Sequence, residues 1–397
     1  MKNGGHELRC FGEVPLRSSF TETAKLKISD NGSLFLPFLM TLYEFVEQQR
    51  PEIKRTLRSH KLEFPLFPGV TKHKISAALM LSLENTQDVC AYFEVPRAVL
   101  EQLLNTPMYR EFSIPKKRGG SRTIEAPDPR LMQVQRTLNH GLQSLYLCDP
   151  DPSVFGFVRN DYQVEPASPI VQNALPHVGK SFVLNIDLKD FFPSIRAHRV
   201  KELFLSDRFG FNDSIATVLA LLTTYQGHLP QGAPTSPIIT NFICAPMDVA
   251  LRELSGRNNW TYTRYADDLT FSSVHAFTDV DIAQIRNIVE LNQFSINDKK
   301  IRRKGRGRRQ EVTGIVVNSK ANVNRKTIKK VRAMMYDLEK NGLTAAAASH
   351  FKNSPVVHPT DSIVFLNRLR GLIAFIGQVR GKEDPVFLQF QEKIRVW

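Results

Sequence analysis

The stretch RYADDLTF, from Arg264 to Phe271, places two carboxylates side by side in a chain whose formal net charge is +14. Apolar and β-branched residues flank the pair, so the sequence predicts two short strands whose tight connection holds Asp267 and Asp268. An isolated acidic pair of this kind is usually an ordinary solvated turn. The segment Lys180–Ile195 favours a functional role for the pair, because its apolar residues predict a strand that ends near Asp187, a third carboxylate, and continues into a helix-like segment. We therefore expect three carboxylates to meet at one end of a sheet.

Three converging carboxylates in a basic protein favour phosphoryl transfer assisted by two metal ions. That chemistry needs carboxylates around two divalent ions roughly 3.5 to 4 Å apart. Hard oxygen ligands select Mg²⁺. The candidate catalytic and metal-binding residues are therefore Asp187, Asp267 and Asp268, and two Mg²⁺ ions are the expected cofactors. Cations around the site would hold the phosphates of the substrate.

The overall charge favours a nucleic acid as the partner. The 397 residues include 53 Lys and Arg against 39 Asp and Glu, and the sequence pI is about 9.6. A basic surface kept only for solubility is the alternative. In KKIRRKGRGRR, Lys299–Arg309, eight of eleven residues are cationic and glycines replace the apolar spacing of an amphipathic membrane helix. This segment favours contact with a phosphate backbone.

Other features exclude several classes of protein. The first ten residues lack the apolar run of a signal peptide, and no stretch approaches 18 consecutive apolar residues. We therefore expect a cytoplasmic protein with no membrane partner. Cys10, Cys90, Cys148 and Cys244 lie far apart, so neither a zinc site nor a disulfide framework is expected.

The pattern of elements predicts three regions and an α+β fold. Residues 1–80 form an N-terminal extension with a helix at Leu34–Gln49, residues 81–317 form a mixed region, and residues 318–397 are helical. The mixed region opens with two short helices within 85–105. Further expected elements are a hairpin with a basic tip at Tyr109–Pro127, a helix at Leu131–Leu147 and a helix at Asp361–Val379.

These motifs, in this order, resemble those of reverse transcriptases. Tyr265–Asp268 is similar to the Y-x-D-D box and Asp187–Phe192 to the strand motif that holds the first metal ligand. The remaining matches are the fingers hairpin within Tyr109–Pro127, the nucleotide loop LPQGAPTSP at Leu229–Pro237 and a basic motif at Asn297–Lys300. The resemblance implies a right-hand polymerase fold, with fingers, a palm built on an antiparallel sheet, and a helical thumb.

The resemblance also implies roles for individual residues. The Leu188 carbonyl would be an extra metal ligand beside the three aspartates. Arg122 and one of Lys116 or Lys117 would hold the triphosphate of a dNTP, and the sequence does not choose between the two lysines. Phe192 would exclude a ribose 2′-hydroxyl. The other nucleotide-binding candidates are Gln231 and Gly232, which would line the pocket, and Lys300 as a general acid toward pyrophosphate.

Two further elements resemble retron reverse transcriptases in particular. Asn173–His177 fits an N-A-x-x-H element before the first catalytic strand, and Val312–Gly314 fits a V-T-G element after the polymerase motifs. Together they favour a retron enzyme over group II intron, diversity-generating or abortive-infection relatives. The resemblance implies a structured noncoding RNA that serves as template and as 2′-hydroxyl primer. Its product would be branched RNA–DNA (msDNA), made for antiviral defence in bacteria.

The RNA itself would be recognised by shape, by phosphate contacts and by its single-stranded loops. The candidate RNA-binding residues are Asn173, His177, Arg302, Arg303, Arg306, Arg308, Val312, Thr313, Gly314, Arg325, Lys326, Lys329, Lys330, Arg368 and Arg370.

Further partners follow from the same resemblance. The helical region ends at Trp397, so we expect no RNase H domain and no fused effector, and we expect a host RNase H and a separately encoded effector protein instead. The alternative from another class is a polymerase-like RNA-binding scaffold that regulates an effector without making DNA. The three aspartates and Arg122 argue against it. The role of the extension, the RNA sequence and the oligomeric state are left open.

Overall fold

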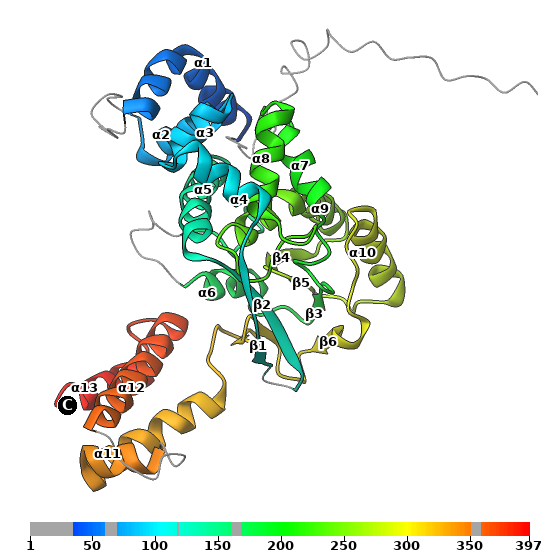
Figure 1. Cartoon of the computed structure of the whole chain (residues 1–397). Helices are drawn as coiled ribbons and strands as arrows, with labels where there is room; N and C mark the ends of the chain where they lie inside the picture. The colour runs from blue at the N-terminus through cyan, green and yellow to red at the C-terminus, as the bar shows by residue number, and fades with distance from the viewer. Residues whose placement is uncertain (1–34, 60–69, 117–118, 160–167, 351–358) are drawn as a thin grey trace, which may run out of the picture.

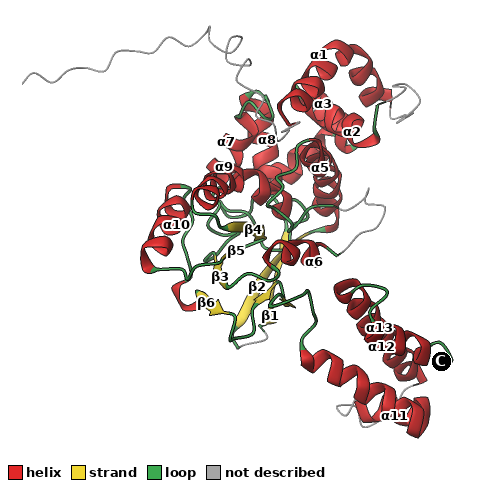
Figure 2. Ribbon diagram, turned by 180° about the vertical axis from the view of Figure 1, so that it is seen from behind, coloured by secondary structure: helices red, strands yellow, loops and turns green. Residues whose placement is uncertain are grey.

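The computed structural model describes residues 35–59, 70–116, 119–159, 168–350 and 359–397 (Figure 1). Lys117, one of the two alternative triphosphate ligands, lies outside the described residues. Helices and a small sheet make up most of the described chain, and helices alone form its C-terminal region (Figures 1 and 2).

The central sheet has four antiparallel strands in the order β4-β5-β3-β6. These strands are β3 (Phe182–Asp187), β4 (Thr261–Tyr265), β5 (Asp268–Ser273) and β6 (Arg302–Gly305). Asp268 at the start of β5 is paired with Asp187 on β3 and with Tyr265 on β4. The predicted strands and their acidic connection therefore form, and they bring the acidic residues to one end of the sheet.

The segment after Asp187 differs from the prediction. It forms a series of turns at residues 189–194 instead of a helix, and helix α7 (Ala197–Leu205) begins only afterwards. Asp190 has φ +46°, which lies in the left-handed region that ends helical structure, and Pro193 follows it.

Helices cover the sheet and build the main hydrophobic core. Helix α9 (Ser236–Arg257) packs against β4 and against α10 (Asp279–Leu291), and α7 packs against α8 (Asp213–Thr223). Helix α5 (Pro129–Cys148), predicted as Leu131–Leu147, contacts α8 and α9. A single cluster of buried side chains runs from Leu42 to Ile296.

The N-terminal helices belong to the same core. They are α1 (Phe35–Ser59), α2 (Lys72–Leu81), α3 (Thr86–Phe93) and α4 (Arg97–Asn105). Helix α2 packs against α5, so the described part of the predicted extension is continuous with the rest of the core. The boundary after residue 80 stays a prediction. The Asn85 side chain caps α3 and accepts a hydrogen bond from the Asp88 backbone N–H at 3.0 Å.

The fingers hairpin consists of β1 (Tyr109–Pro115) and β2 (Ser121–Pro127), paired in register from Tyr109 opposite Pro127. It projects beside the central sheet (Figure 1). The remaining short elements are α6 (Pro169–Ala174), the 3₁₀ turns η3 (Leu175–His177) and η4 (Asp298–Lys300), and the strands β7 (Glu311–Val312) and β8 (Ile315–Val316).

The C-terminal region is helical, as predicted, with α11 (Arg325–His350), α12 (Pro359–Arg380) and α13 (Pro385–Ile394). Within the described ranges, α12 alone is long and apolar enough to cross a membrane by length and composition. Its Phe365, Leu369 and Ile373 are buried in a second hydrophobic cluster with α11 and α13, whereas Ile363 is exposed. The apolar composition of α12 is explained by this packing.

A buried ion pair fixes the acidic turn. Arg264 on β4 and Asp248 on α9 are both fully buried, and Arg264 Nη2 lies 2.7 Å from Asp248 Oδ2 while Nε lies 2.8 Å from Oδ1. Tyr262 donates to the same carboxylate at 2.7 Å. Arg264 Nη1 donates to the carbonyl of Ala266 at 3.2 Å and to Asn241 Oδ1 at 3.1 Å. The guanidinium thus connects α9 to the turn that precedes Asp267.

Replacement of Asp248 by Ala should destabilise the fold strongly, because it leaves the Arg264 charge buried without its carboxylate. We expect the free energy of unfolding, measured by urea denaturation, to fall by about 3 to 5 kcal/mol. The matched control is Arg97→Ala, which breaks the exposed Arg97–Glu101 pair and should leave the unfolding midpoint almost unchanged. A similar small effect for both variants would contradict a structural role for the buried pair.

Candidate active site

The backbone around the acidic turn is fixed by hydrogen bonds to neighbouring segments. Ala266 has φ +58°, which turns the chain sharply between β4 and β5. The Leu188 N–H donates to the Asp267 carbonyl at 2.9 Å, and the Asn297 N–H donates to the Asp187 carbonyl at 2.8 Å. The three predicted aspartates therefore stand on adjoining positions of one rigid end of the sheet.

Mutual repulsion and burial favour the protonated forms of two of these carboxyls. Burial, followed by the charges of Asp267 and Asp187, raises the pKa of Asp268 to about 6. Burial and the charge of Asp187 also raise the pKa of Asp267. The positive charge of Lys300 lowers both pKa values. Arg122 also lowers the pKa of Asp267, and Arg302 lowers that of Asp268. Burial and the neighbouring carboxylates together outweigh these cations, so both pKa values remain raised.

Asp187 has its own polar partners. Its Oδ1 accepts a hydrogen bond from Lys300 Nζ at 2.6 Å, and the Asn297 amide lies 3.5 Å from Oδ2. Asn297 holds Asp187 through its backbone as well, a role that the motif match at Asn297–Lys300 did not assign. In the part of the chain that the structure describes, no group of three or more Cys, His, Asp or Glu side chains is arranged so that it could hold a metal ion. Asp187 is instead paired with Lys300.

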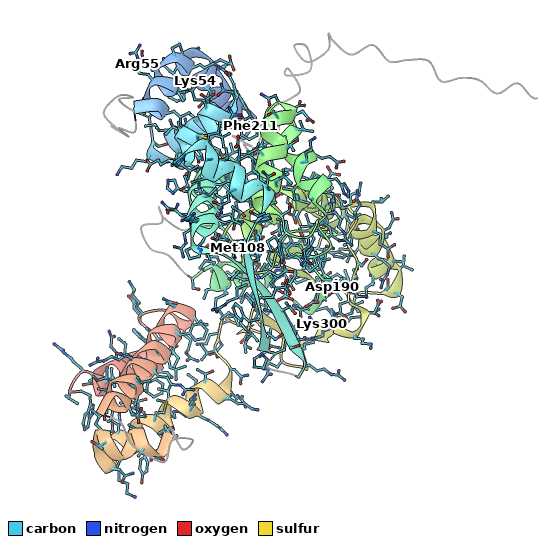
Figure 3. The ribbon with its side chains drawn as sticks, viewed as in Figure 1. Lys54, Arg55, Met108, Asp190, Phe211 and Lys300 are labelled. Carbon is cyan, nitrogen blue, oxygen red and sulfur yellow. The ribbon has the colours of Figure 1, made fainter. Side chains whose placement is uncertain are left out.

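A cleft of about 540 Å³ opens on one side of the carboxylates, and Asp190 and Lys300, which Figure 3 labels near the sheet, both line it. The cleft brings together residues from the fingers hairpin, the turn after β3 and the acidic turn. The predicted site residues that line it are Lys116, Arg122, Asp187, Leu188, Phe192, Gln231, Asp267 and Lys300. The cleft also includes Phe157, which sequence reasoning missed.

The nucleotide loop is fastened to the fingers hairpin. The Glu125 N–H donates to the Gln231 carbonyl at 2.9 Å, and the Gln231 N–H donates to the Glu125 carboxylate at 3.2 Å. His228 contacts the same carboxylate at 3.1 Å. Gly232 does not line the cleft as predicted: it packs against β2, with φ +139°, and a Cβ there would lie 2.8 Å from the Glu125 carbonyl oxygen. Glycine is required at this close approach.

A second cavity, of about 420 Å³, adjoins the carboxylates from another direction. It shares Asp187 and Lys300 with the cleft and adds Asp268, which the cleft lacks. The other residues of this cavity are Ile170, Asn185, Ile186, Tyr265, Thr270, Arg302, Glu311, Thr313 and Gly314. The acidic end of the sheet is therefore open to two separate ligand groups.

The V-T-G element contacts the helix that leads into the N-A-x-x-H element. Thr313 donates to the Ile170 carbonyl at 2.7 Å, joining the β7–β8 hairpin to α6. His177 is fully buried between the hydroxyls of Ser272 and Thr263, at 2.7 and 2.8 Å, and burial lowers its pKa to about 3.

Several predicted RNA contacts must therefore be corrected. His177, Asn173 and Val312 are buried at 1% exposure or less, so RNA cannot reach their side chains directly. These residues pack inside the protein because they join α6 and the hairpin to the sheet. Thr313 and Gly314 still face the second cavity.

The predicted RNA-binding cations, in contrast, are all exposed. They form two groups, one on β6 and the loop after it and one on the C-terminal helices: Arg302, Arg303, Arg306 and Arg308, then Arg325, Lys326, Lys329, Lys330, Arg368 and Arg370. Arg303 pairs with Asp279, and Arg306 donates to the Gly179 carbonyl at 2.8 Å.

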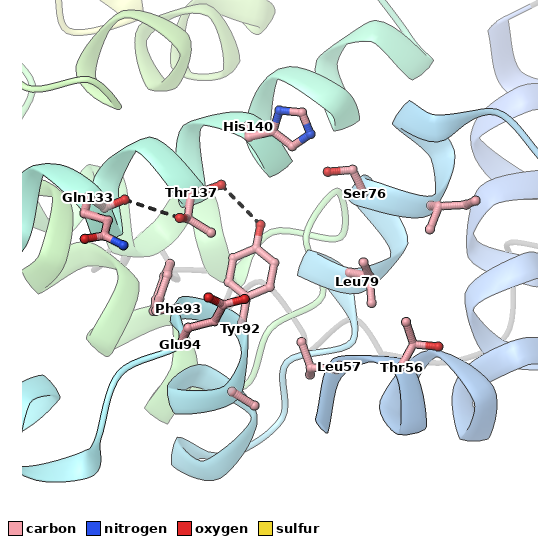
Figure 4. A pocket seen from close by; sticks show the side chains of 12 residues that line it. Thr56, Leu57, Ser76, Leu79, Tyr92, Phe93, Glu94, Gln133, Thr137 and His140 are labelled. Atoms are coloured by element: carbon pink, nitrogen blue, oxygen red, sulfur yellow. Dashed lines mark hydrogen bonds between the residues drawn. The ribbon is translucent and has the colours of Figure 1, made fainter. Parts of the chain in front are cut away.

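Another cavity, of about 330 Å³, lies between α1, α2, α3 and α5 (Figure 4). Apolar side chains such as Leu57 and Leu79 line much of it, and Tyr92 donates to the Thr137 carbonyl at 3.4 Å. None of the three aspartates or their cations lies in this cavity, so we assign it no part in the chemistry.

The class of protein follows from this geometry and from a comparison with known families. The family described as "Reverse transcriptase (RNA-dependent DNA polymerase)" matches residues 114–315, just over half of the chain. The matched range includes the second strand of the fingers hairpin, the central sheet and all three aspartates. The chain belongs to the reverse transcriptase family, and the predicted right-hand polymerase fold is confirmed.

Similar proteins define the group within this family. The chain is 34% identical to the retron Mx162 reverse transcriptase of Myxococcus xanthus over 70% of its own length and 59% of that protein. It is 36% identical to the retron Mx65 reverse transcriptase of the same organism, over 61% and 58%. It is 33% identical to the retron Ec86 reverse transcriptase of Escherichia coli, over 72% of this chain and 83% of that one. The chain is a retron-type reverse transcriptase, as its sequence indicated, and spans less than two thirds of the Myxococcus relatives.

The raised pKa of Asp268 predicts that the metal-free protein becomes less stable as the pH rises. The folded state binds the Asp268 proton more tightly than the unfolded chain does, so this contribution to stability is present near pH 4 and is lost as the pH rises to about 6. In EDTA above pH 7, Asp268→Asn should therefore have a higher free energy of unfolding than the wild type. The expected difference is only about 1 kcal/mol, because Asp268 is exposed and water screens its charge.

The measurement is urea denaturation of both proteins at a series of pH values. Asp190→Asn is the matched control, since Asp190 is an aspartate of the neighbouring cleft but is not a member of the acidic cluster. A stability difference between Asp268→Asn and the wild type that does not vary with pH would contradict the electrostatic explanation.

Proposed function

We propose that the protein is an RNA-directed DNA polymerase, a nucleotidyltransferase that uses a structured noncoding RNA as both template and 2′-hydroxyl primer. The observation that most supports this proposal is the convergence of Asp187, Asp267 and Asp268 between two cavities, one of them lined with cations. A binding scaffold would have no use for three converging carboxylates. The similarity to retron reverse transcriptases supports the branched RNA–DNA product.

The site fits divalent metal ions. Asp187, Asp267 and Asp268 present hard oxygen donors, and a bound cation would favour the ionised forms of Asp267 and Asp268, whose pKa values are raised by burial and then by the neighbouring carboxylates. These three side chains would hold two Mg²⁺ ions, with the Leu188 carbonyl as a further ligand. When bound, the ions would activate the attacking hydroxyl and stabilise the leaving oxygen.

The cleft supplies the groups that an incoming dNTP requires. Lys116 and Arg122 are exposed on the fingers hairpin and face the cleft, where they would hold the triphosphate. Phe192 would lie against the sugar and exclude a ribonucleotide. Lys300 lies 2.6 Å from Asp187 and is placed to donate a proton to pyrophosphate once it is released from that carboxylate.

The second cavity suits the strand that provides the attacking hydroxyl. It reaches Asp187 and Asp268 from a side that the dNTP cleft does not occupy. Arg302 at its border could contact the phosphate of the priming nucleotide. The first attack would come from the ribose 2′-hydroxyl of the RNA, and later ones from the 3′-hydroxyl of the growing DNA.

The exposed cations of the C-terminal helices would bind the folded RNA. Arg325, Lys326, Lys329 and Lys330 lie in the first turns of α11, where positive charge opposes the helix dipole. Such an arrangement is stabilised when phosphate groups lie nearby. Arg368 and Arg370 on α12 would extend the same surface.

The wider role that we propose is antiviral defence in the bacterial cytoplasm. It would require a separately encoded effector protein, and a host RNase H would remove the copied part of the template. These partners rest on the resemblance to retron enzymes alone.

Replacement of Asp267 by Asn should abolish dNTP incorporation, because it removes one negative donor from the acidic cluster while keeping the side-chain shape. We expect a loss of at least about a thousandfold in primer extension, with the Kd for the RNA nearly unchanged. Asp190→Asn is again the control and should keep most of the activity. DNA synthesis by Asp267→Asn near the wild-type rate would refute the assignment of the cluster.

The nucleic acid that copurifies with the protein tests the retron function. We expect a DNA that remains joined to RNA after denaturation and is released by a 2′,5′-debranching enzyme. The Asp267→Asn variant, purified in parallel, should contain the RNA without the DNA. Linear DNA that needs no debranching, or DNA in the variant, would contradict priming from a 2′-hydroxyl.

A further inference from the structure

Phe157 lies in the nucleotide cleft, although no sequence motif assigned it a role. Its ring contacts the ring of Phe192, with centroids 5.9 Å apart and planes tilted by 43°. Both residues line the cleft, and both are half-buried against the main core. The residue expected to select the sugar therefore has an aromatic neighbour from a distant part of the chain.

Phe192 contacts a second ring as well. It packs edge-on against Phe191, with centroids 5.5 Å apart. Phe191 is buried and lies 5.7 Å from Phe294 in the core. Because an aromatic side chain is kept in one rotamer by its close neighbours, removal of either flanking ring gives Phe192 room to turn.

The loop that contains Phe157 is held firmly. Phe157 has φ +65°, a left-handed backbone conformation that is uncommon for a non-glycine residue. Its carbonyl accepts a hydrogen bond from Gln143 at 2.8 Å. Gly156 approaches the acidic turn so closely that a Cβ would lie 2.4 Å from the Ala266 nitrogen. The position of Phe157 is therefore fixed relative to the aspartates.

We propose that Phe157 is a specificity-determining residue that holds the Phe192 ring in the position that excludes a ribose 2′-hydroxyl. This inference rests on the proposed function, since it concerns the choice between deoxyribonucleotides and ribonucleotides. Phe157 acts through Phe192 and is a positioning residue. Without its ring, Phe192 turns into the vacated space and the cleft admits the extra hydroxyl.

The test is steady-state primer extension with dNTPs and with rNTPs, on wild type, Phe157→Ala, Phe157→Leu and Phe157→Tyr. The measured quantity is the ratio of kcat/KM for the dNTP to kcat/KM for the matching rNTP. We expect Phe157→Ala to lower this ratio by at least about tenfold, Phe157→Leu to lower it less, and Phe157→Tyr to keep it. Catalysis with dNTPs should change much less than the ratio.

A double-mutant cycle with Phe192→Ala shows whether the two rings act together. Because Phe157 works through Phe192, the double variant should have the same ratio as Phe192→Ala alone. Phe155→Leu is the matched control, since Phe155 belongs to the same loop but does not line the cleft, and it should keep the wild-type ratio.

The possible outcomes separate this inference from the proposed function. An unchanged ratio in both Phe157→Ala and Phe157→Leu, with dNTP incorporation retained, overturns the role of Phe157. Equal losses with dNTPs and rNTPs do the same, because they indicate a general structural role. Absence of DNA synthesis by the wild type would instead overturn the polymerase assignment. If Phe157→Ala does not fold, Phe157→Leu decides.

Discussion

The buried pair of Arg264 and Asp248 is the interaction on which the active site depends. Arg264 stands three residues before Asp267 and donates to the Ala266 carbonyl, while Asp248 belongs to the long helix α9. A fully buried guanidinium is costly unless its hydrogen bonds are satisfied. Here Asp248, Asn241 and the turn itself satisfy them. The acidic turn therefore keeps one position relative to the helix, and the carboxylates on it cannot separate to relieve their repulsion.

That rigidity explains the electrostatics of the site. Burial, together with the fixed closeness of the carboxylates, raises the pKa values of Asp267 and Asp268, while Lys300 binds Asp187. A protein that served only as a scaffold would gain stability by losing one of these charges. Keeping them makes sense where divalent cations and phosphates arrive together. The two cavities on either side of the acidic end give each reactant its own approach.

Local sequence was sufficient for features that depend on residue type and spacing. The fingers hairpin, the strand that ends at Asp187 and the acidic connection were predictable, because alternation and turn residues determine them. The fate of Asn173 and His177 was not. A short polar motif is compatible with a surface or with an interior, and only the tertiary structure, which buries both residues and places His177 between Thr263 and Ser272, decided between them.

Phe157 escaped prediction for a related reason. Its φ of +65° and its contact with Phe192 arise from the loop closing over the acidic turn, and a Gly-Phe pair in a loop gives no local signal of this. Gly232 shows the same limit, because its motif indicated the right loop without revealing that the residue packs on the hairpin backbone. Roles that depend on close approach between distant segments need the three-dimensional structure.

The second hydrophobic cluster has a practical consequence for exchanging parts between retron enzymes. It combines side chains of α11, α12 and α13 with Val171 of α6, Val183 of β3 and residues of the β7–β8 hairpin. A chimera cut at the start of α11 would divide this hydrophobic cluster between two parent sequences. To transfer RNA preference between such enzymes, α6 and the β7–β8 hairpin should therefore be exchanged together with the C-terminal helices. These parts come from two separate stretches of sequence.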